Sequence, residues 1–436
     1  MIPFYYVFLN SNEYIGRMDP DLLVAMETST LGRWSLGRLQ DLFSHFPVVC
    51  VVGARQVGKT TLVQCGFPEM PTITFDPSTD IGSARSDPDL FLQTHPAPCF
   101  LDEIQFVPPL LSSMKRLVDR EKRPGMFLLS GSQQFSVLHS LAESMAGRVA
   151  FLELPPLARG EILGNPQDRA FLRLWIAGRG EIGTYPVIPR PESVWPRIWR
   201  GGMPALIGLP DSMVPDWCDG YVRTYLERDL RTAGGVSDLA EFRRFLALLA
   251  SQTAQEINAA HLGRELGMDR KTALRWASLA QAGFQWRELP AFSRNSAKRI
   301  AGRPKGHMAD TGLACHLLRI QSPVGLEEHP SRGALFETWV VQQILRGFQD
   351  RGNPPHASHF RTLAGAEVDL VLEEDGWVFP IEVKLTAKPG PVDARGLDSF
   401  RETWPEHRIA PGLLVCAVEN PTWIRKNVLA VPWWAL

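Results

Sequence analysis

The sequence carries almost no net charge, because 46 lysines and arginines stand against 47 aspartates and glutamates, a formal charge of −1 over 436 residues. Near-neutrality excludes attraction of nucleic acid by the molecule as a whole, so contact with a polyanion would need a local basic patch. Internal repeats and low-complexity segments are also absent, which argues against a repeat architecture. The length and the hydrophobic content of 44% predict a globular protein of roughly two to four domains.

Paired cysteines and long apolar runs are missing as well. The cysteines form no C-x-x-C pair and several lie within apolar runs, so we expect buried free thiols in a reducing cytoplasm. Residues 2–9 are apolar but too short to cross a bilayer, and they lack the features of a signal peptide, so no membrane partner is expected. We expect Met18 to be the natural start, with residues 1–17 not native. The cysteines are Cys50, Cys65, Cys99, Cys218, Cys315 and Cys416.

One segment, by contrast, has a specific chemistry. Residues 53–60 read Gly-Ala-Arg-Gln-Val-Gly-Lys-Thr, a full match to the phosphate-binding pattern G-x-x-x-x-G-K-[ST]. The glycines let the backbone N–H groups face an anion, Lys59 reaches the β- and γ-phosphates, and Thr60 offers a hydroxyl to Mg²⁺. The sequence therefore predicts ATP and Mg²⁺ as cofactors. The predicted nucleotide-binding residues are Gly53, Arg55, Gln56, Val57, Gly58, Lys59, Thr60 and Thr61.

Short apolar strands alternate with helices around this loop, which predicts an α/β fold with a parallel sheet wrapped by flanking helices. The order of strand, glycine loop and helix is the setting that a phosphate-binding loop requires. Residues 176–216, rich in glycine, proline and tryptophan, are expected to form a loop-rich connection, and residues 217–250 to be helical. The predicted strands cover residues 46–52, 71–76, 97–103, 126–132 and 149–154, and helices are predicted at 19–45, after the loop, at 87–95 and at 108–122.

Two carboxylates end the predicted strand at 97–103. Asp102 is predicted to hold Mg²⁺, and Glu103 to polarise the water that attacks the γ-phosphate. Adjacent acids at the end of a buried strand repel each other and lose hydration, and a bound cation removes that cost. The next strand places Ser130 and Ser132 between the acids and the γ-phosphate, and the sequence does not choose between them. Arg148 is predicted to neutralise transition-state charge, in cis or from a neighbouring subunit; a plain surface arginine is an equal alternative.

Together these motifs resemble a family of prokaryotic AAA+ ATPases that carry a C-terminal domain of unknown function. The resemblance implies a sensor-1 role for Ser130 or Ser132, and it leaves a homo-oligomer open. It covers most of residues 30–436. The matching segments are GARQVGKTTL at 53–62, FLDEIQ at 100–105, LLSGSQQF at 128–135, Ala146 to Val149, Pro156-Leu157 with Glu161, and residues 200–204, 225–229 and 309–313.

Residues 255–283 have helix-turn-helix spacing. The first helix is expected to end at Gly267, and the second to begin after Asp269 as its N-cap. The segment that follows is basic and contains no acid, so we predict a winged helix that contacts DNA or RNA phosphates through residues 255–307. A wing that binds protein, with its charges merely solvated, is the alternative. The basic residues of this segment are Arg294, Lys298, Arg299, Arg303 and Lys305.

The C-terminal part contains an acid-rich strand pair. Asp369 lies on a predicted strand at 367–372, a turn follows at 374–376, and Glu382 and Lys384 project from one face of the returning strand at 378–384. This pattern resembles the PD-(D/E)xK phosphodiesterase superfamily, which implies that Asp369 and Glu382 bind Mg²⁺ and that Lys384 steadies the nucleophile or the developing charge. Glu337, on the predicted helix 331–347, matches the acid those folds carry on their first helix. An inactive binding platform is the alternative.

The whole chain is thus expected to be a P-loop parallel sheet, an α-rich winged-helix segment and an α/β nuclease-like domain. We predict an Mg-dependent ATP-hydrolysing AAA+ protein that acts on or near nucleic acid. The alternative is a nucleotide-dependent regulatory switch, or a toxin–antitoxin type component, whose C-terminal half only binds partners. The expected domains are a leader (1–45), an ATPase core (46–160), a lid with connecting helices (161–235), a winged helix-turn-helix (236–325) and the nuclease-like domain (326–436).

Overall fold

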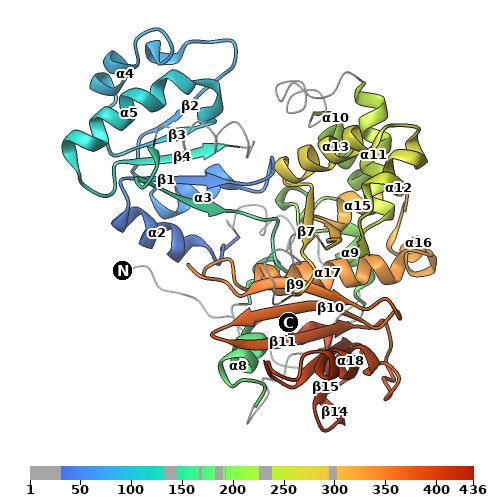
Figure 1. The fold of residues 1–436 in the computed structure, drawn as a ribbon. Coiled ribbons are helices and arrows are strands. Elements are labelled where there is room, and N and C mark those ends of the chain that lie inside the picture. Colours follow the sequence, from blue (N-terminus) through green and yellow to red (C-terminus); the bar gives the residue numbers. More distant parts are fainter. Residues whose placement is uncertain are drawn as a thin grey trace, which may run out of the picture.

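Three β-sheets, with helices around and between them, organise the residues that the structure describes (Figure 1). In this computed structural model those residues are 31–131, 145–165, 169–181, 190–191, 193–224, 238–293 and 302–436. A parallel sheet comes first, a mainly helical middle unit follows, and the chain ends in a mixed sheet. Within these ranges no helix is long and apolar enough to cross a membrane.

The first sheet is parallel, with the strand order β2-β3-β4-β1-β5. Each strand lies within its predicted range, so the α/β fold prediction is confirmed. The carboxyl ends of β1, β3 and β4 therefore meet along one edge, where ligands bind in such sheets. The bounds are β1 Val48–Val52, β2 Thr72–Thr74, β3 Cys99–Asp102, β4 Phe127–Gly131 and β5 Val149–Glu153.

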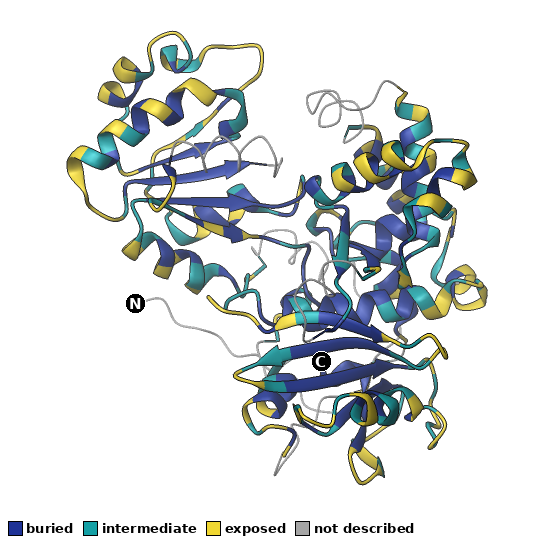
Figure 2. Cartoon of the chain, in the orientation of Figure 1, coloured by how far each residue is buried: buried dark blue, intermediate teal, exposed yellow. Residues whose placement is uncertain are grey.

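Both faces of this sheet are covered, which explains why β1 is apolar throughout. Val49 and Val51 pack in the same core as α2 and α3, whereas Val48, Cys50 and Val52 pack with α4 and α5. The inner strands β1, β3 and β4 are buried, the edge strands β2 and β5 are partly exposed, and the outer sides of α4 and α5 are exposed (Figure 2). The helices are α2 (Leu36–His45), α3 (Lys59–Gly66), α4 (Pro88–Thr94) and α5 (Pro108–Glu121).

Helices also occupy part of the range predicted as a loop-rich connection, so that prediction is wrong for α9 (Trp195–Arg200) and the start of α10 (Val214–Thr224). Trp195, Ile198 and Trp199 are buried at helical spacing along one face of α9, but six residues are too few for this period to stand out in the sequence. Between β5 and the C-terminal sheet the chain also forms α7 (Arg159–Ile162), α8 (Ala170–Ala177), α11 (Leu239–Ser251), α15 (Thr311–Leu317) and α16 (Pro323–Glu328).

The helix-turn-helix segment consists of α12 (Ala259–Leu266) and α13 (Arg270–Ala282). Gly267 ends α12 in a left-handed conformation, and the Asp269 side chain accepts a hydrogen bond from the Thr272 N–H (3.0 Å) at the start of α13, as predicted. An antiparallel sheet in the order β6-β8-β7 adjoins these helices. The predicted wing residues Arg294, Lys298 and Arg299 lie outside the described residues. The strands are β6 (Gln255–Glu256), β7 (Trp286–Leu289) and β8 (Lys305–Met308).

The C-terminal sheet has the order β14-β15-β13-β11-β10-β9, and β12 also pairs with β11. The helix α17 (Arg332–Arg346) packs on one face and lies between this sheet and the middle unit, where it is buried along most of its length (Figures 1 and 2). Against the other face packs α18 (Arg395–Thr403). The strands are β9 (His356–Arg361), β10 (Glu367–Glu374), β11 (Trp377–Val383), β12 (Arg408–Ile409), β13 (Gly412–Cys416), β14 (Thr422–Arg425) and β15 (Val428–Pro432).

Short 3-10 turns complete the described elements. They cover Ile81–Ser83, Ile104–Phe106, Pro204–Leu206, Asp211–Met213 and Trp433–Ala435.

Candidate functional site

The phosphate-binding loop connects the end of β1 to α3, as the sequence pattern predicts. Gly53 (φ +153°) and Gly58 (φ +92°) have backbone conformations that favour glycine. A Cβ atom at position 53 would lie 2.4 Å from the carbonyl oxygen of Leu154, so this glycine also permits close packing against the end of β5. Gln56, between them, has φ +59° and is exposed. The loop is therefore shaped by backbone geometry that the two glycines make accessible.

Lys59 is the first residue of α3 and is buried. Its Nζ donates hydrogen bonds to two carbonyl oxygens of the loop, Gly53 O (3.0 Å) and Ala54 O (2.8 Å). These contacts hold the ammonium group inside the loop, where phosphate oxygens are expected. Of the other predicted loop residues, Val57 is buried, Arg55 is half-buried and Thr61 is exposed.

The loop and the acidic strand end are joined directly. The Thr60 hydroxyl donates a hydrogen bond to Asp102 Oδ2 (2.8 Å), and Asp102 is buried at the end of β3. Ser130, fully buried on β4, donates to the other oxygen of Asp102, and its own oxygen accepts a hydrogen bond from the Glu103 N–H (3.3 Å). The structure therefore brings Thr60, Asp102 and Ser130 together at the edge predicted from the strand order.

Glu103 follows Asp102 with a left-handed backbone (φ +57°), which turns its side chain away from the strand direction, and its carboxylate accepts a hydrogen bond from the Gln105 side chain. Ser132, the alternative to Ser130, lies outside the described residues. Arg148 is partly exposed and forms an ion pair with Asp119 on α5. In this conformation that pairing is compatible with the surface-arginine alternative.

A cleft of about 250 Å³ opens beside the loop. One wall is made by Ala54 and the segment after β5, and the other by α13 and β7, including Phe284 and Trp286. An ion pair between Glu153 and Arg287 (2.6 Å) spans the two walls. The parallel sheet and the middle unit thus both border the space next to the phosphate-binding loop.

The C-terminal carboxylates also converge, but around a lysine. Nζ of Lys305, on β8, lies 2.6 Å from Glu337 Oε1, 2.6 Å from Glu367 Oε1 and 2.7 Å from Asp369 Oδ1. The prediction that Lys305 is an exposed wing residue is wrong: its side chain is only 1% exposed, because these carboxylates draw the ammonium group into the interior. Burial alone would lower the pKa of Lys305, but the surrounding carboxylates raise that pKa well above its ordinary value, so the ammonium stays charged.

Glu382 and Lys384 lie beside this group. Lys384 Nζ is 2.5 Å from Glu382 Oε1, while Glu382 Oε2 is buried and has no hydrogen-bond partner. Asp369 Oδ2 accepts a hydrogen bond from the Val383 N–H (2.8 Å), which fixes Asp369 against β11. Burial raises the pKa of Glu382, and Asp369 raises that pKa further. Across the described ranges, no three or more His, Cys, Asp or Glu side chains are arranged to hold a metal ion.

A β-bulge explains how Asp369 reaches the lysine. The register between β9 and β10 shifts between Val368 and Val371. Val368 packs on the α18 side of the sheet, whereas Leu370 packs on the α17 side, so the irregularity falls at Asp369. Bulges commonly redirect a side chain in this way. Asp369 is thereby turned toward Glu337 on α17.

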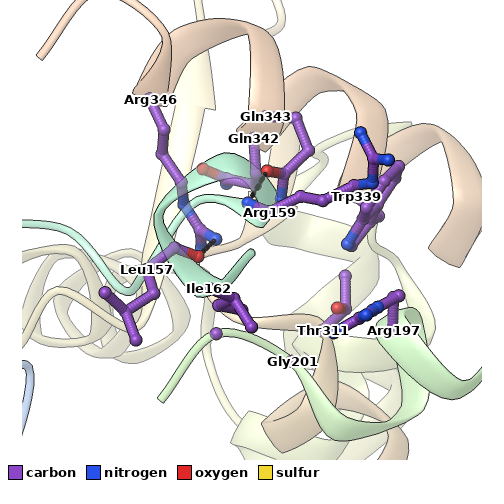
Figure 3. A pocket seen from close by; sticks show the side chains of 11 residues that line it. Leu157, Arg159, Ile162, Arg197, Gly201, Thr311, Trp339, Gln342, Gln343 and Arg346 are labelled. Carbon is purple, nitrogen blue, oxygen red and sulfur yellow. Dashed lines mark hydrogen bonds between the residues drawn. The ribbon is translucent and has the colours of Figure 1, made fainter. Parts of the chain in front are cut away.

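A polar junction connects the parallel sheet with the rest of the chain. Its small cavity, about 10 Å³, is bordered by Arg159, Arg197 and Arg346 from three different helices (Figure 3). Arg346, on α17, donates hydrogen bonds to the carbonyl oxygens of Leu157 (2.9 Å) and Ala309 (2.7 Å). The chain segment after β5 is therefore held by the helix that also covers the C-terminal sheet.

Known protein families match the same three parts of the chain: the parallel sheet, the middle unit and the C-terminal sheet. The family model described as AAA domain matches residues 45–163, and models of two domains of unknown function, DUF8612 and DUF4143, match residues 191–324 and 332–436. Over 359 residues the chain is 32% identical to the uncharacterized protein Rv2008c of Mycobacterium tuberculosis, and equally to Mb2031c of Mycobacterium bovis. Each alignment covers 82% of this chain and 74% of the relative. The chain belongs to the family of these mycobacterial proteins.

Solved structures resemble the chain at lower sequence identity. The Walker-type ATPase PABY2304 of Pyrococcus abyssi is 13% identical with a TM-score of 0.43, covering 66% of this chain and 96% of that chain. The RuvB Holliday junction branch migration motor of Thermotoga maritima is 15% identical with a TM-score of 0.26, covering 62% of this chain and 90% of that chain. The AAA-type P-loop ATPase fold of this family member rests instead on its strand order and on the AAA domain match.

Sequence reasoning missed two residues of these sites. Glu367 contacts Lys305, and its position two residues before Asp369 on one strand is a signal that was available. Glu161 was matched only as part of a motif, yet its buried carboxylate accepts hydrogen bonds from the Trp34 N–H, the Ala158 N–H and the Gln349 side chain, each at 2.8 Å. Ala158 lies three residues before Glu161 at the start of the same helix, a local capping spacing, whereas the distances of Trp34 and Gln349 along the chain give no indication that they meet Glu161.

Proposed function

We propose that this protein binds ATP with Mg²⁺ at the loop of residues 53–60 and hydrolyses it. The observation that carries the proposal is the contact between the Thr60 hydroxyl and the Asp102 carboxylate. A hydroxyl and a buried carboxylate in contact, next to a phosphate-binding loop, are the oxygen donors that Mg²⁺ prefers at such a site. The residues present therefore fit the cation, which would neutralise charge on the phosphates when bound.

The remaining roles follow from where each group lies. Lys59 would exchange its carbonyl partners in the loop for phosphate oxygens. Ser130 would orient Asp102 and the Glu103 backbone through its two hydrogen bonds. The Glu103 carboxylate would polarise the water that attacks the γ-phosphate. The cleft of about 250 Å³ beside Ala54 is positioned to receive the nucleoside.

Thr60→Ala tests the cation assignment. Removing the hydroxyl takes away one proposed Mg²⁺ ligand and leaves the loop backbone unchanged, so Mg²⁺-dependent phosphate release from ATP is expected to fall at least about tenfold. Thr403→Ala, on the exposed side of α18, is the matched control and should hydrolyse ATP as the parent protein does. Unchanged phosphate release by Thr60→Ala would contradict the assignment.

A second proposed activity is nucleic-acid binding by the helix-turn-helix. Its supporting observation is that Arg270, Lys271 and Arg275 are all exposed on α13, the second helix of the pair. Exposed basic side chains there are suited to phosphate contacts, with log affinity falling about 0.9 per contact against log salt. Changing these three residues to glutamine should weaken binding to duplex DNA and lower the salt slope by about 2.7. Salt-independent, negligible DNA binding by the parent protein would exclude this activity.

The C-terminal cluster favours the alternative for that half of the chain. With Lys305 between the carboxylates, the described conformation supports a nucleotide-dependent switch whose C-terminal half binds partners, rather than an active nuclease. We also propose that the chain forms a homo-oligomer and that it divides into the five domains expected from the sequence. Sedimentation of the full chain with and without ATP tests the oligomer.

A further inference from the structure

Three short motifs outside the phosphate-binding loop meet at the cavity of the polar junction. Leu157 and Arg159 belong to the segment after β5, Gly201 and Gly202 directly follow α9, and Thr311 begins α15. All of them border the cavity of about 10 Å³ (Figure 3). The proposed ATP hydrolysis uses none of these residues, so the cavity where they meet has no role yet.

The lining of this cavity is positively charged and rich in hydrogen-bond donors. Arg159, Arg197 and Arg346 border it, whereas no carboxylate of the described residues does. The Thr311 hydroxyl and the Trp339 indole belong to lining side chains that can also donate. Apart from Arg197, which is partly exposed, these residues are buried. Because charged donors bind anions more strongly than neutral acceptors, such a lining is suited to a negative ion.

Arg346 lacks a counter-charge among the described residues. Its two terminal nitrogens donate to the carbonyl oxygens of Leu157 and Ala309, and its Nε is buried without a hydrogen-bond partner. Asp310 and Glu161 are the nearby acids, but neither forms an ion pair with it, and oxygens of both accept backbone N–H groups. Burial lowers the pKa of Arg346 to about 10, so the side chain stays charged at neutral pH. A buried charge with only neutral partners is costly, and an anion beside it removes that cost.

We propose that the junction cavity binds one chloride ion among the side chains of Arg159, Arg197 and Arg346. A volume of about 10 Å³ admits a single water-sized species and excludes phosphate, sulfate and organic anions. A water molecule at the same place would accept hydrogen bonds but would leave the positive charge uncompensated. The chloride ion joins the segment after β5 to α9 and α17, and so it stabilises the contact between the parallel sheet and the other two parts of the chain.

Thermal unfolding of the nucleotide-free full-length protein in sodium chloride and in sodium gluconate, at equal ionic strength, tests the proposal. A ligand that binds only the folded state raises Tm, so the parent protein should have a Tm at least about 2 °C higher in chloride. Equilibrium dialysis with radiolabelled chloride should find about one bound ion per chain. Arg197→Met removes one guanidinium group from the lining and should abolish both effects. Arg408→Met, at an exposed position, is the matched control and should keep both.

A parent protein that has the same Tm in both salts and binds no labelled chloride would overturn the proposal, with water as the occupant. Chloride binding that Arg197→Met retains would also overturn it, because the ion would then lie elsewhere. If Arg197→Met does not fold, Thr311→Val provides the test, since it removes only a hydroxyl donor from the lining. Thr311→Val is expected to bind chloride about tenfold more weakly, and an unchanged affinity would contradict the proposal. Because no nucleotide is present, none of these outcomes depends on ATP hydrolysis.

Discussion

At the scale of single residues, the proposed ATP site requires Lys59 to exchange its hydrogen-bond partners when ATP binds. Its ammonium group is held by the carbonyl oxygens of Gly53 and Ala54, at distances that phosphate oxygens would take over. Lys59→Ala should therefore weaken ATP binding by about 10- to 100-fold, since a hydrogen bond to a charged group contributes about 1.5–3 kcal/mol. Calorimetric titration with ATP measures this, with Lys388→Ala, an exposed lysine, as control. Equal affinity in both variants would count against the loop assignment.

Ser130 is buried at the proposed site, where it would position the two acids. It donates to Asp102 and accepts from the Glu103 N–H, so it fixes both acids of the proposed site. Ser130→Ala should lower kcat for ATP hydrolysis about tenfold or more while ATP affinity stays near that of the parent, because no contact to the nucleotide is lost. A fall in affinity without a change in kcat would argue for a merely structural serine. Ser44→Ala, on the exposed end of α2, is the control.

The environment of Lys305 could not be predicted from the sequence. The loop motif and the Asp-Glu pair could be predicted because each is local, and the strand order places them together. The basic segment was predicted to be an exposed wing that contacts nucleic acid, yet its last basic residue, Lys305 at the start of β8, is 1% exposed and lies among carboxylates that follow it by more than thirty residues in the chain. Long-range charge pairing of this kind has no period or spacing that a single sequence displays.

At the scale of elements, two segments about a hundred residues apart interlock. Asp310 is the N-cap of α15, and its carboxylate accepts hydrogen bonds from the Leu313 N–H (3.1 Å) and the Gly202 N–H (2.7 Å). A Cβ atom at Gly201 would lie 2.2 Å from Asp310 Oδ1, and one at Gly312 would lie 2.4 Å from the Arg200 carbonyl oxygen. The motifs at residues 200–204 and 309–313 are therefore two halves of one contact.

Gly201→Ala should accordingly destabilise the protein beyond the cost of its backbone conformation. Gly208→Ala is a matched control, because Gly208 has a similar φ (+80° against +74°) but nothing within 4 Å of an added Cβ. Both positions have a positive φ that disfavours alanine, and Gly201, with ψ −158°, lies in a backbone region that is essentially limited to glycine, at a cost of about 1–3 kcal/mol. Only Gly201→Ala adds about 1–3 kcal/mol from crowding the fixed Asp310 carboxylate. Thermal unfolding measures both, and equal Tm shifts would contradict this account.

Prediction of elements succeeded where a local signal exists. The five parallel strands, the helix predicted at 87–95 and the turn of Asp375 and Gly376, which both have a positive φ, follow from apolar runs and turn residues. The helix α9 was missed because it has only six residues, so its one buried face of Trp195, Ile198 and Trp199 is too short a pattern to stand out in a segment rich in glycine and proline. The bulge in β10 was missed for a related reason, since it depends on the pairing with β9.

At the scale of the whole molecule, the polar junction ties the parallel sheet to the other two parts. Arg346 is buried, and burial lowers its pKa to about 10. Arg346→Met should leave the carbonyl oxygens of Leu157 and Ala309 without these donors, at about 1–3 kcal/mol for each group that finds no other. We expect a lower Tm, whereas Arg408→Met, at an exposed position, should leave Tm within experimental error. Equal Tm values would mean that the junction contributes little.

The central claim is that the chain hydrolyses ATP with Glu103 directing the attacking water. The most direct measurement is steady-state phosphate release together with ATP affinity for Glu103→Gln, with the exposed Glu402→Gln as control. The account predicts that Glu103→Gln binds ATP as the parent does but hydrolyses it about 10²- to 10⁴-fold more slowly, because an amide cannot take the proton from water. Turnover equal to that of the parent protein, with ATP bound, would contradict it.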